Sequence, residues 1–196
     1  MTARQRAGLA AATFAAAAIL ACGDPNAPVA RFPNYADTLG LYALNGAPRG
    51  APTAIHLIRG VGSSSGVATD GSFTFDVAVD IDAAGRPVLY PVRALAAPFL
   101  GRHRVGIRRE SRPFDSITEA PTDGYTHDSL AVVAIGEVVL IESTDPDATQ
   151  ACFGNAVIYA KMVVDSITAS TRRVFVRITA DPNCGFRSLV PGVPTE

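Results

Sequence analysis

A short glycine- and serine-rich segment has the spacing of a nucleophilic serine site. Gly62-Ser63-Ser64-Ser65-Gly66 matches the pattern G-x-S-x-G, in which a serine stands on a sharp turn between a strand and a helix. Here residues 67–71 lead into another strand-like segment, so the helix that this chemistry needs is missing. A set of Ser, Asp and His side chains would have to be assembled on a frame of strands. We therefore expect this segment to be a flexible loop.

Acidic residues suggest a second kind of chemistry, calcium binding. Asp80, Asp82 and Gly85 occupy the first, third and sixth positions of a calcium-binding loop. The fifth position is Ala84, however, and Pro91 stands where the closing glutamate belongs. An EF-hand is therefore excluded.

A looser metal site remains an alternative, because Asp76 and Asp80 share one face of a predicted strand. We expect instead that this face is solvated and that a tight turn follows it. The three histidines, His56, His103 and His127, are too far apart in the sequence for metal-ligand spacing. We expect no metal site and no cofactor.

Arginines are concentrated in one short segment. Arg102, Arg104 and Arg108 fall on one face of a predicted strand over residues 102–109, where they would form a basic stripe. Because guanidinium groups bind phosphate with a fixed fork, the stripe could meet an anionic lipid or polymer. We favour a second interpretation, in which this segment is an edge strand. Its charges would prevent sheet-to-sheet aggregation and would be neutralised by acidic neighbours. No aromatic residues are interleaved with the arginines, which argues against nucleic acid as a partner.

The first 22 residues indicate export. Arg4 and Arg6 precede an alanine-rich apolar stretch, which ends in Ile19-Leu20-Ala21-Cys22. A basic start, a short apolar core and small residues before a break are typical of a cleaved signal peptide rather than of a membrane-spanning helix. The last four residues resemble the lipobox of bacterial lipoproteins, in which signal cleavage leaves a lipid-bearing cysteine as the new N-terminus. The resemblance covers residues 1–25.

This resemblance implies a location and a membrane contact. Cys22 would carry several acyl chains, and multiple acylation makes the attachment stable because one chain alone binds a membrane only marginally. The protein would then be lipid-anchored in a bacterial cell envelope, on the periplasmic face. Gly23 follows the cysteine, whereas in enteric bacteria an aspartate there retains lipoproteins at the inner membrane. We therefore expect the outer membrane.

The cysteine count agrees with lipidation. The chain has three cysteines, and an exported protein normally pairs its thiols. Lipidation of Cys22 leaves Cys152 and Cys184, which we expect to form a structural disulfide across the last predicted hairpin. There is no CxxC motif and no histidine close in sequence, which argues against a redox or metal-binding pair. In the chain-entropy model, closing a loop of about 32 residues stabilises the fold by roughly 3 to 4 kcal/mol.

Composition divides the chain into three parts. Residues 1–21 are the predicted signal peptide, residues 22–35 are a flexible tether rich in proline and asparagine, and residues 36–196 are a single β domain. Removal of the signal peptide leaves 15 basic and 18 acidic residues, a formal net charge of −3 that does not by itself indicate a polyanionic partner. No later apolar run reaches the ~18 residues that a membrane-spanning helix needs.

Alternation of apolar and polar residues predicts an all-β fold. The clearest strand is 73–81, with Phe73, Phe75, Val77, Val79 and Ile81 on one face. The other predicted strands are 38–44, 54–59, 88–92, 102–109, 129–141 and a final hairpin of 156–167 and 174–180. Segment 129–141 is apolar on both faces and predicts one central strand, or two with a bend at Gly136. About eight to ten short antiparallel strands predict a β-sandwich or a small β-barrel.

Three hypotheses for the function remain. We favour a non-catalytic binding or accessory module, held at the membrane by its lipid, with an envelope protein or an anionic lipid or polymer as its partner. The first alternative is a hydrolase acting on envelope polymers, which requires His103 or His127 to meet Asp or Ser side chains in one cleft. The second is a lipid-carrying β-barrel, which requires a large apolar cavity.

Overall fold

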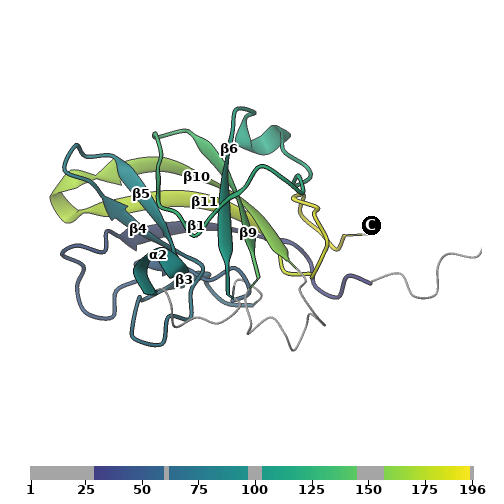
Figure 1. Ribbon diagram of the computed structural model, residues 1–196, viewed down its shortest axis with the longest axis horizontal. Coiled ribbons are helices and arrows are strands. Elements are labelled where there is room, and N and C mark those ends of the chain that lie inside the picture. The colour runs from purple at the N-terminus through teal and green to yellow at the C-terminus, as the bar shows by residue number, and fades with distance from the viewer. Residues whose placement is uncertain (1–28, 60–61, 97–102, 145–156, 195–196) are drawn as a thin grey trace, which may run out of the picture.

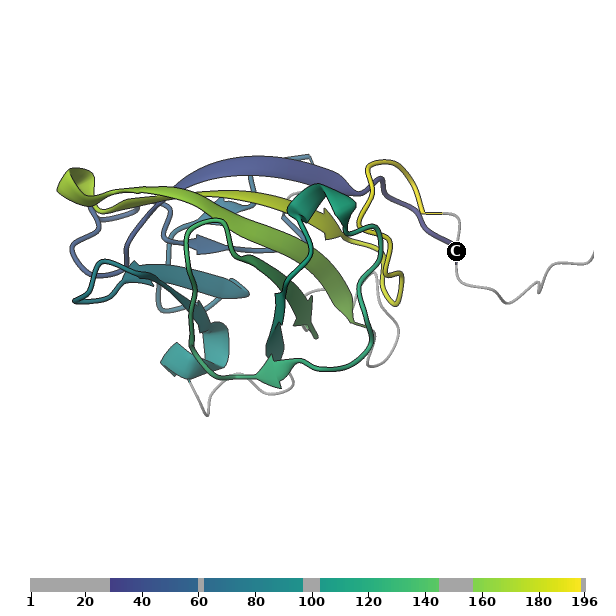
Figure 2. The same ribbon diagram turned by 90° about the horizontal axis from the view of Figure 1, so that it is seen from above.

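The protein is a sandwich of two antiparallel sheets (Figure 1). The computed structural model describes residues 29–59, 62–96, 103–144 and 157–194, and nearly all regular structure in these ranges is β-strand. In Figure 2 the long strands β1, β10 and β11 form the upper layer, and β4 and β5 lie below them. The two sheets remain separate, which decides between the predicted sandwich and the predicted barrel in favour of the sandwich.

The larger sheet has six strands and the smaller has five. In spatial order, the larger sheet consists of β1 (Tyr35–Tyr42), β11 (Arg173–Asp181), β10 (Ile158–Thr168), β9 (Val138–Ser143), β6 (Val105–Glu110) and β7 (Thr126–His127). The smaller sheet consists of β3 (Gly66–Val67), β2 (Ala54–Ile55), β4 (Val77–Ile81), β5 (Pro87–Pro91) and β8 (Ala131–Val132). The helical elements in the described ranges are α2 (Val92–Ala96) and the 3-10 turns η1 (Phe114–Ser116) and η3 (Ala169–Thr171).

The predicted final hairpin is present and lies between β1 and β9 in the larger sheet. β-Branched residues are dense in both of its strands, which suits a pleated surface buried between neighbours. η3 connects β10 to β11, and Arg172 then adopts a left-handed conformation with φ of 51°. β1 pairs with β11 from Tyr35, opposite Ala180, to Tyr42, opposite Arg173. The strand nearest the N-terminus is therefore joined to the last strand along its whole length.

Apolar side chains fill two layers. The main cluster lies between the sheets and contains the inward-facing residues of both, including Leu41, Phe75 and Met162. A second cluster lies on the outer face of the larger sheet, where Ile117 and Leu189 pack over it from the connection between β6 and β7 and from the C-terminal segment. Because both faces of the larger sheet are covered, its central strands are apolar on both sides.

The apolar segment 129–141 is two strands, the second of the two predicted alternatives. β8 belongs to the smaller sheet and β9 to the larger one. Gly136 lies between them with φ of 82°, a conformation that favours glycine because it has no Cβ. The bend at Gly136 therefore carries the chain from one layer of the sandwich to the other.

The strand predicted over 73–81 is shorter than expected and its second face is not solvated. β4 begins only at Val77, and Phe73 has φ of 52°, outside the strand region. Asp76 is fully buried, as is Ala78 on the same face. The prediction that Asp76 is solvated is therefore wrong, because alternation alone does not show what covers the polar side of a strand.

The domain begins earlier than the predicted boundary at residue 36. The backbone N–H groups of Arg31 and Phe32 donate to Asn183 Oδ1 at 2.7 and 3.0 Å. Asn34 is buried, and its N–H donates to the carbonyl of Gly192 at 2.8 Å. The last residues of the segment predicted as a flexible tether are thus part of the folded domain.

Candidate functional site

A serine, a histidine and an aspartate that lie far apart in the sequence meet between the two sheets. Asp76 immediately precedes β4, His103 lies two residues before β6, and Ser143 is the last residue of β9. His103 Nε2 lies 3.1 Å from Asp76 Oδ1 and 3.3 Å from Ser143 Oγ. The Ser143 hydroxyl donates to the same Oδ1 atom, and the N–H of Leu57 donates to Oδ2 at 2.7 Å. Asp76, His103 and Ser143, here called the Asp76 cluster, thereby connect the two sheets.

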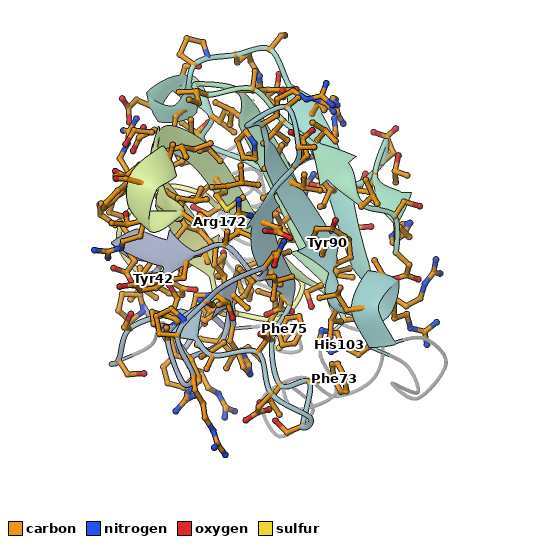
Figure 3. All side chains as sticks on the ribbon, turned by 90° about the vertical axis from the view of Figure 1, so that its left-hand side faces the viewer. Tyr42, Phe73, Phe75, Tyr90, His103 and Arg172 are labelled. Atoms are coloured by element: carbon orange, nitrogen blue, oxygen red, sulfur yellow. The ribbon has the colours of Figure 1, made fainter. Side chains whose placement is uncertain are left out.

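The Asp76 cluster lies in an enclosed part of the molecule. Figure 3 shows His103 on the same side of the sandwich as Phe73 and Phe75, the aromatic residues that precede Asp76 in the chain. Asp76 and Ser143 are fully buried, and only 3% of His103 is exposed. A substrate therefore has no access to the Ser143 hydroxyl in this conformation.

The direction of the hydrogen bonds also argues against catalysis by the Asp76 cluster. An ionised carboxylate only accepts hydrogen bonds, so the His103 Nε2 atom that approaches Asp76 carries a proton. The same nitrogen faces Ser143 and cannot also take the proton of the serine. In a hydrolytic triad, by contrast, the carboxylate and the serine contact opposite nitrogens of the histidine. The cluster thus has the residue types of a triad but not its arrangement.

The charges around Asp76 keep its carboxyl group ionised. Burial by itself would raise the pKa of Asp76. The hydrogen bond and charge of His103, the charge of His56 and the hydroxyl of Ser143 outweigh burial and hold this pKa below its ordinary value. His56 Nδ1 lies 3.8 Å from Asp76 Oδ2. Two histidines that the sequence left separate are thus brought to one carboxylate.

The glycine- and serine-rich loop lies beside the same region and has no helix after it. A two-residue strand that the sequence pattern did not predict, β3, begins directly at Gly66, although Gly60 and Val61 lie outside the described residues. Ser65 is fully buried, and its hydroxyl donates to Asp37 Oδ2 at 3.1 Å. The hydrogen bond to Asp37 on β1 thus fixes the position of Ser65. The loop is therefore not freely flexible at this residue.

Tyr35 adds a buried hydroxyl near Asp76. Its hydroxyl donates to the carbonyl of Leu57 at 2.5 Å. Burial raises the pKa of Tyr35, and the nearby carboxylates of Asp76 and Asp37 raise it further. Tyr35 therefore remains protonated and acts as a hydrogen-bond donor.

The predicted arginine stripe is balanced by acidic partners. Arg102 lies outside the described residues. Arg104 Nε donates to Asp128 Oδ2 at 3.1 Å, and Arg108 Nη1 donates to Asp123 Oδ1 at 3.3 Å. β6 lies next to the edge of its sheet, beyond which only the two-residue β7 follows. The expected neutralisation by acidic neighbours is thus present at Arg104 and Arg108, but β6 is not the edge strand that we expected, because β7 pairs with it. Anion binding at this stripe stays a prediction.

A groove of about 770 Å³ borders the same strand. Its lining includes Arg108 and Asp123 as well as Leu130, of which 53% is exposed. Arg109, also in the lining, donates to Glu137 and to the carbonyl of Val132. An anion entering the groove would have to compete with these acceptors for the two guanidinium groups.

The other candidate metal ligands are engaged in local contacts. Asp80 Oδ1 accepts a hydrogen bond from Arg172 at 3.1 Å, and Asp82 Oδ1 closes the predicted turn by accepting from the N–H of Ala84 at 2.9 Å. His127 Nε2 contacts Glu142 on the outer face of the larger sheet. Within the described ranges, no three His, Cys, Asp or Glu side chains are grouped as ligands for a metal ion.

Lys161, the single lysine of the chain, has a buried role that sequence analysis missed. Its Nζ donates to the carbonyls of Phe114 and Ile117 at 3.0 and 2.7 Å and lies 4.7 Å from the centre of the Phe114 ring. Burial lowers the pKa of Lys161, although the carboxylate of Asp115 opposes this shift. Lys161 thereby holds the η1 segment against the outer face of the larger sheet. In the sequence, only its position within an otherwise apolar strand could have indicated this buried role.

The predicted cysteine chemistry falls mostly outside the described residues. Cys22 and Cys152 both lie there. Cys184 is half-buried next to the main core cluster, in the segment that follows β11. Lipidation of Cys22 and the pairing of Cys152 with Cys184 therefore stay predictions.

No family model, curated protein or solved structure matches this chain. Among the described residues, no helix combines the length and the apolar character needed to cross a bilayer.

Proposed function

We propose that this chain is an exported, lipid-anchored protein of a bacterial cell envelope, and that its β-sandwich is a non-catalytic binding or accessory module. The observation that carries the proposal is the N-terminal segment ending in Ile19-Leu20-Ala21-Cys22, which resembles a lipobox after a basic and apolar signal. The odd number of cysteines supports it, because lipidation of Cys22 leaves an even number for pairing.

The non-catalytic role is supported by the arrangement of the Asp76 cluster. A hydrolase is the second candidate, because His103 does meet Asp76 and Ser143, as that hypothesis requires. The three side chains are enclosed, however, and the nitrogen that faces the serine already carries a proton. General-base activation of the hydroxyl needs a free lone pair on that nitrogen. We therefore assign the cluster to holding the two sheets together.

Replacement of the lipid-bearing residue tests the location. In a bacterial host, we expect the unaltered chain to partition with membranes after a high-salt wash, with an intact mass of residues 22–196 plus acyl chains. Cys22→Ala should retain the signal or be released as a soluble domain that melts at the same temperature. Gly23→Ala is the matched control, since it alters the neighbouring residue and keeps the cysteine. An unmodified Cys22, or a Cys22→Ala variant that stays on washed membranes without its signal, would refute the anchor.

A further inference from the structure

Exposed apolar side chains gather at one end of the sandwich. Of the seven large apolar side chains that are exposed in the described residues, four lie in the two terminal segments: Val29, Phe32, Val190 and Val193, with 81%, 39%, 42% and 54% exposure. The backbone bridge between Asn34 and Gly192 joins these segments in antiparallel fashion. Phe32 and Val190 each lie two residues from the bridged pair, and Val193 is next to it. We call these four residues the terminal apolar patch.

The terminal apolar patch is held in place by two buried asparagines. Asn34 Nδ2 donates to the carbonyls of Ser188 and Val190 at 2.7 and 2.9 Å. Asn183 Nδ2 donates to the carbonyl of Phe32 at 2.8 Å, and its oxygen accepts from the N–H of the same residue. Because these side-chain amides fix the backbone at Phe32 and at Val190, these two apolar residues are presented on a preorganised surface rather than on loose ends.

The patch lies at the end of the molecule that the predicted lipid anchor reaches most easily. The described segment 29–34 and the C-terminal segment lie at the same end of the molecule, opposite the turn between β10 and β11 (Figures 1 and 2). Seven residue steps separate Cys22 from Val29, so even a fully extended chain holds the two Cα atoms within about 25 Å. The nine residues of β11 span roughly 30 Å. The anchor therefore reaches the end with the patch more easily than the far end.

We infer that the terminal apolar patch rests on the lipid bilayer and sets the orientation of the domain on the membrane. This inference rests on the proposed anchor at Cys22. Apolar side chains beside a covalently held lipid bury their surface at the boundary between headgroups and acyl chains. Arg31, which is exposed between Val29 and Phe32, would meet the lipid phosphates at the same depth. The turn between β10 and β11 then points away from the membrane.

The chain has no tryptophan, so an introduced indole reports on one position only. Phe32→Trp places it in the patch, and Ser170→Trp places it in η3 at the opposite end. Both proteins are reconstituted through their own acyl chains into vesicles of phosphatidylethanolamine and phosphatidylglycerol that contain lipids with brominated chains. Val193→Trp serves as a second patch position, and melting curves show that each variant is folded.

We expect brominated lipid to quench the emission of Phe32→Trp and Val193→Trp at least about twofold more than that of Ser170→Trp. Equal quenching at both ends, in a sample whose mass shows acylated Cys22, would overturn the inference and leave the proposed function standing. A sample without acylation would refute the proposed function and the inference together. A blue shift of the patch indole that depends on protein concentration and not on brominated lipid would mean that a second copy covers the patch, which also overturns the inference.

Discussion

The carboxylate of Asp76 accepts hydrogen bonds from segments that belong to both layers of the sandwich. One oxygen receives the hydroxyl of Ser143 and the imidazole of His103, and the other receives the N–H of Leu57. A buried charge is tolerated only when it is paired and fully hydrogen-bonded, since desolvation is otherwise very unfavourable. Removal of any one of these hydrogen-bond donors would leave part of the desolvation free energy of the carboxylate uncompensated. The residue types that suggest catalysis are therefore explained by the connection they make between the layers.

Replacement of the buried carboxylate should reduce stability strongly. We expect Asp76→Asn to lower the free energy of unfolding by about 3 to 5 kcal/mol, because it leaves His103 beside a neutral amide. Ser143→Ala, which removes one donor, should cost about 1 to 2 kcal/mol and keeps the test open if Asp76→Asn does not fold. The control is Asp165→Asn, which removes an exposed carboxylate paired with Arg177 and should cost less than about 1 kcal/mol. Urea unfolding measures all three, and equal effects at positions 76 and 165 would contradict the assigned role.

The same carboxylate should make stability depend on pH in the acidic range. The folded state lowers the pKa of Asp76, so its contribution is complete above the unfolded-state pKa of about 4 and is lost as the pH falls through the lower folded-state pKa. Urea unfolding of the unaltered protein and Ser143→Ala across this range should show it. We expect Ser143→Ala to lose less stability on acidification, because the Ser143 hydroxyl is one of the groups that lower the pKa. Parallel pH profiles would rule out this coupling.

At the scale of elements, the turn between β10 and β11 is fixed by Arg172. Its Nε donates to the carbonyl of Asn45 at 2.9 Å, and Nη2 donates to Asp80 Oδ1 at 3.1 Å. These contacts join the end of the hairpin to the turn after β1 and to β4 in the smaller sheet. The residue does this from a left-handed conformation with φ of 51°, which is unfavourable for any side chain with a Cβ. Its contacts must therefore compensate for backbone strain.

Two substitutions at this position separate the contacts from the strain. Arg172→Ala loses the guanidinium contacts and keeps a Cβ in the left-handed region, whereas Arg172→Gly loses the contacts and relieves the strain. We expect both variants to be less stable than the unaltered protein, with the glycine variant more stable than the alanine variant by about 1 kcal/mol. The midpoints of urea unfolding compare them directly. An alanine variant as stable as the glycine variant would show that the conformation at position 172 imposes no strain.

The sequence predicted elements best where one periodic pattern extends over many residues. The final hairpin follows from dense β-branched residues around a turn, and its strands were placed within a few residues of their observed ends. The two-residue strands β2, β3, β7 and β8 are too short to show any period. Ile117 and Ala120 cover the outer face of the larger sheet. They belong to an irregular connection, which has no periodic pattern of apolar residues from which it could be predicted.

The Asp76 cluster could not be predicted from sequence patterns, for a different reason. Asp76, His103 and Ser143 are 27 and 40 residues apart along the chain, so they are joined by the folding of two sheets and not by local spacing. The residues on the polar face of the strand predicted at 73–81 were identified correctly. The alternation of apolar and polar residues is the same, however, whether a carboxylate on that face is buried or solvated. The two cases are distinguished only by the partners of the carboxylate, which come from β9 and from the segment just before β6.

At the scale of the whole molecule, the first and last described segments, residues 29–34 and 182–194, lie next to the long strands of the larger sheet. β1 follows the terminal segment directly and pairs with β11, which pairs with β10. Near the start of β10, the carbonyl of Val157 accepts a hydrogen bond at 2.9 Å from the N–H of Gly185, the residue after Cys184. Cys152 is five residues before Val157, and so its Cα lies within about 18 Å of it. The predicted disulfide would close the loop that contains both central strands.

Loss of this disulfide should therefore lower the stability of the entire domain. Cross-linking a loop of this length restricts the unfolded chain by roughly 3 to 4 kcal/mol, which corresponds to about 10 °C in the melting temperature of a domain of this size. We expect the double variant Cys152→Ser with Cys184→Ser, which leaves no unpaired thiol between them, to melt lower by that amount. The unaltered protein treated with reductant should fall to the same temperature, while the double variant should not respond. If reductant leaves the unaltered protein unchanged, these two cysteines are not paired, and the stability of β10 and β11 comes from packing alone.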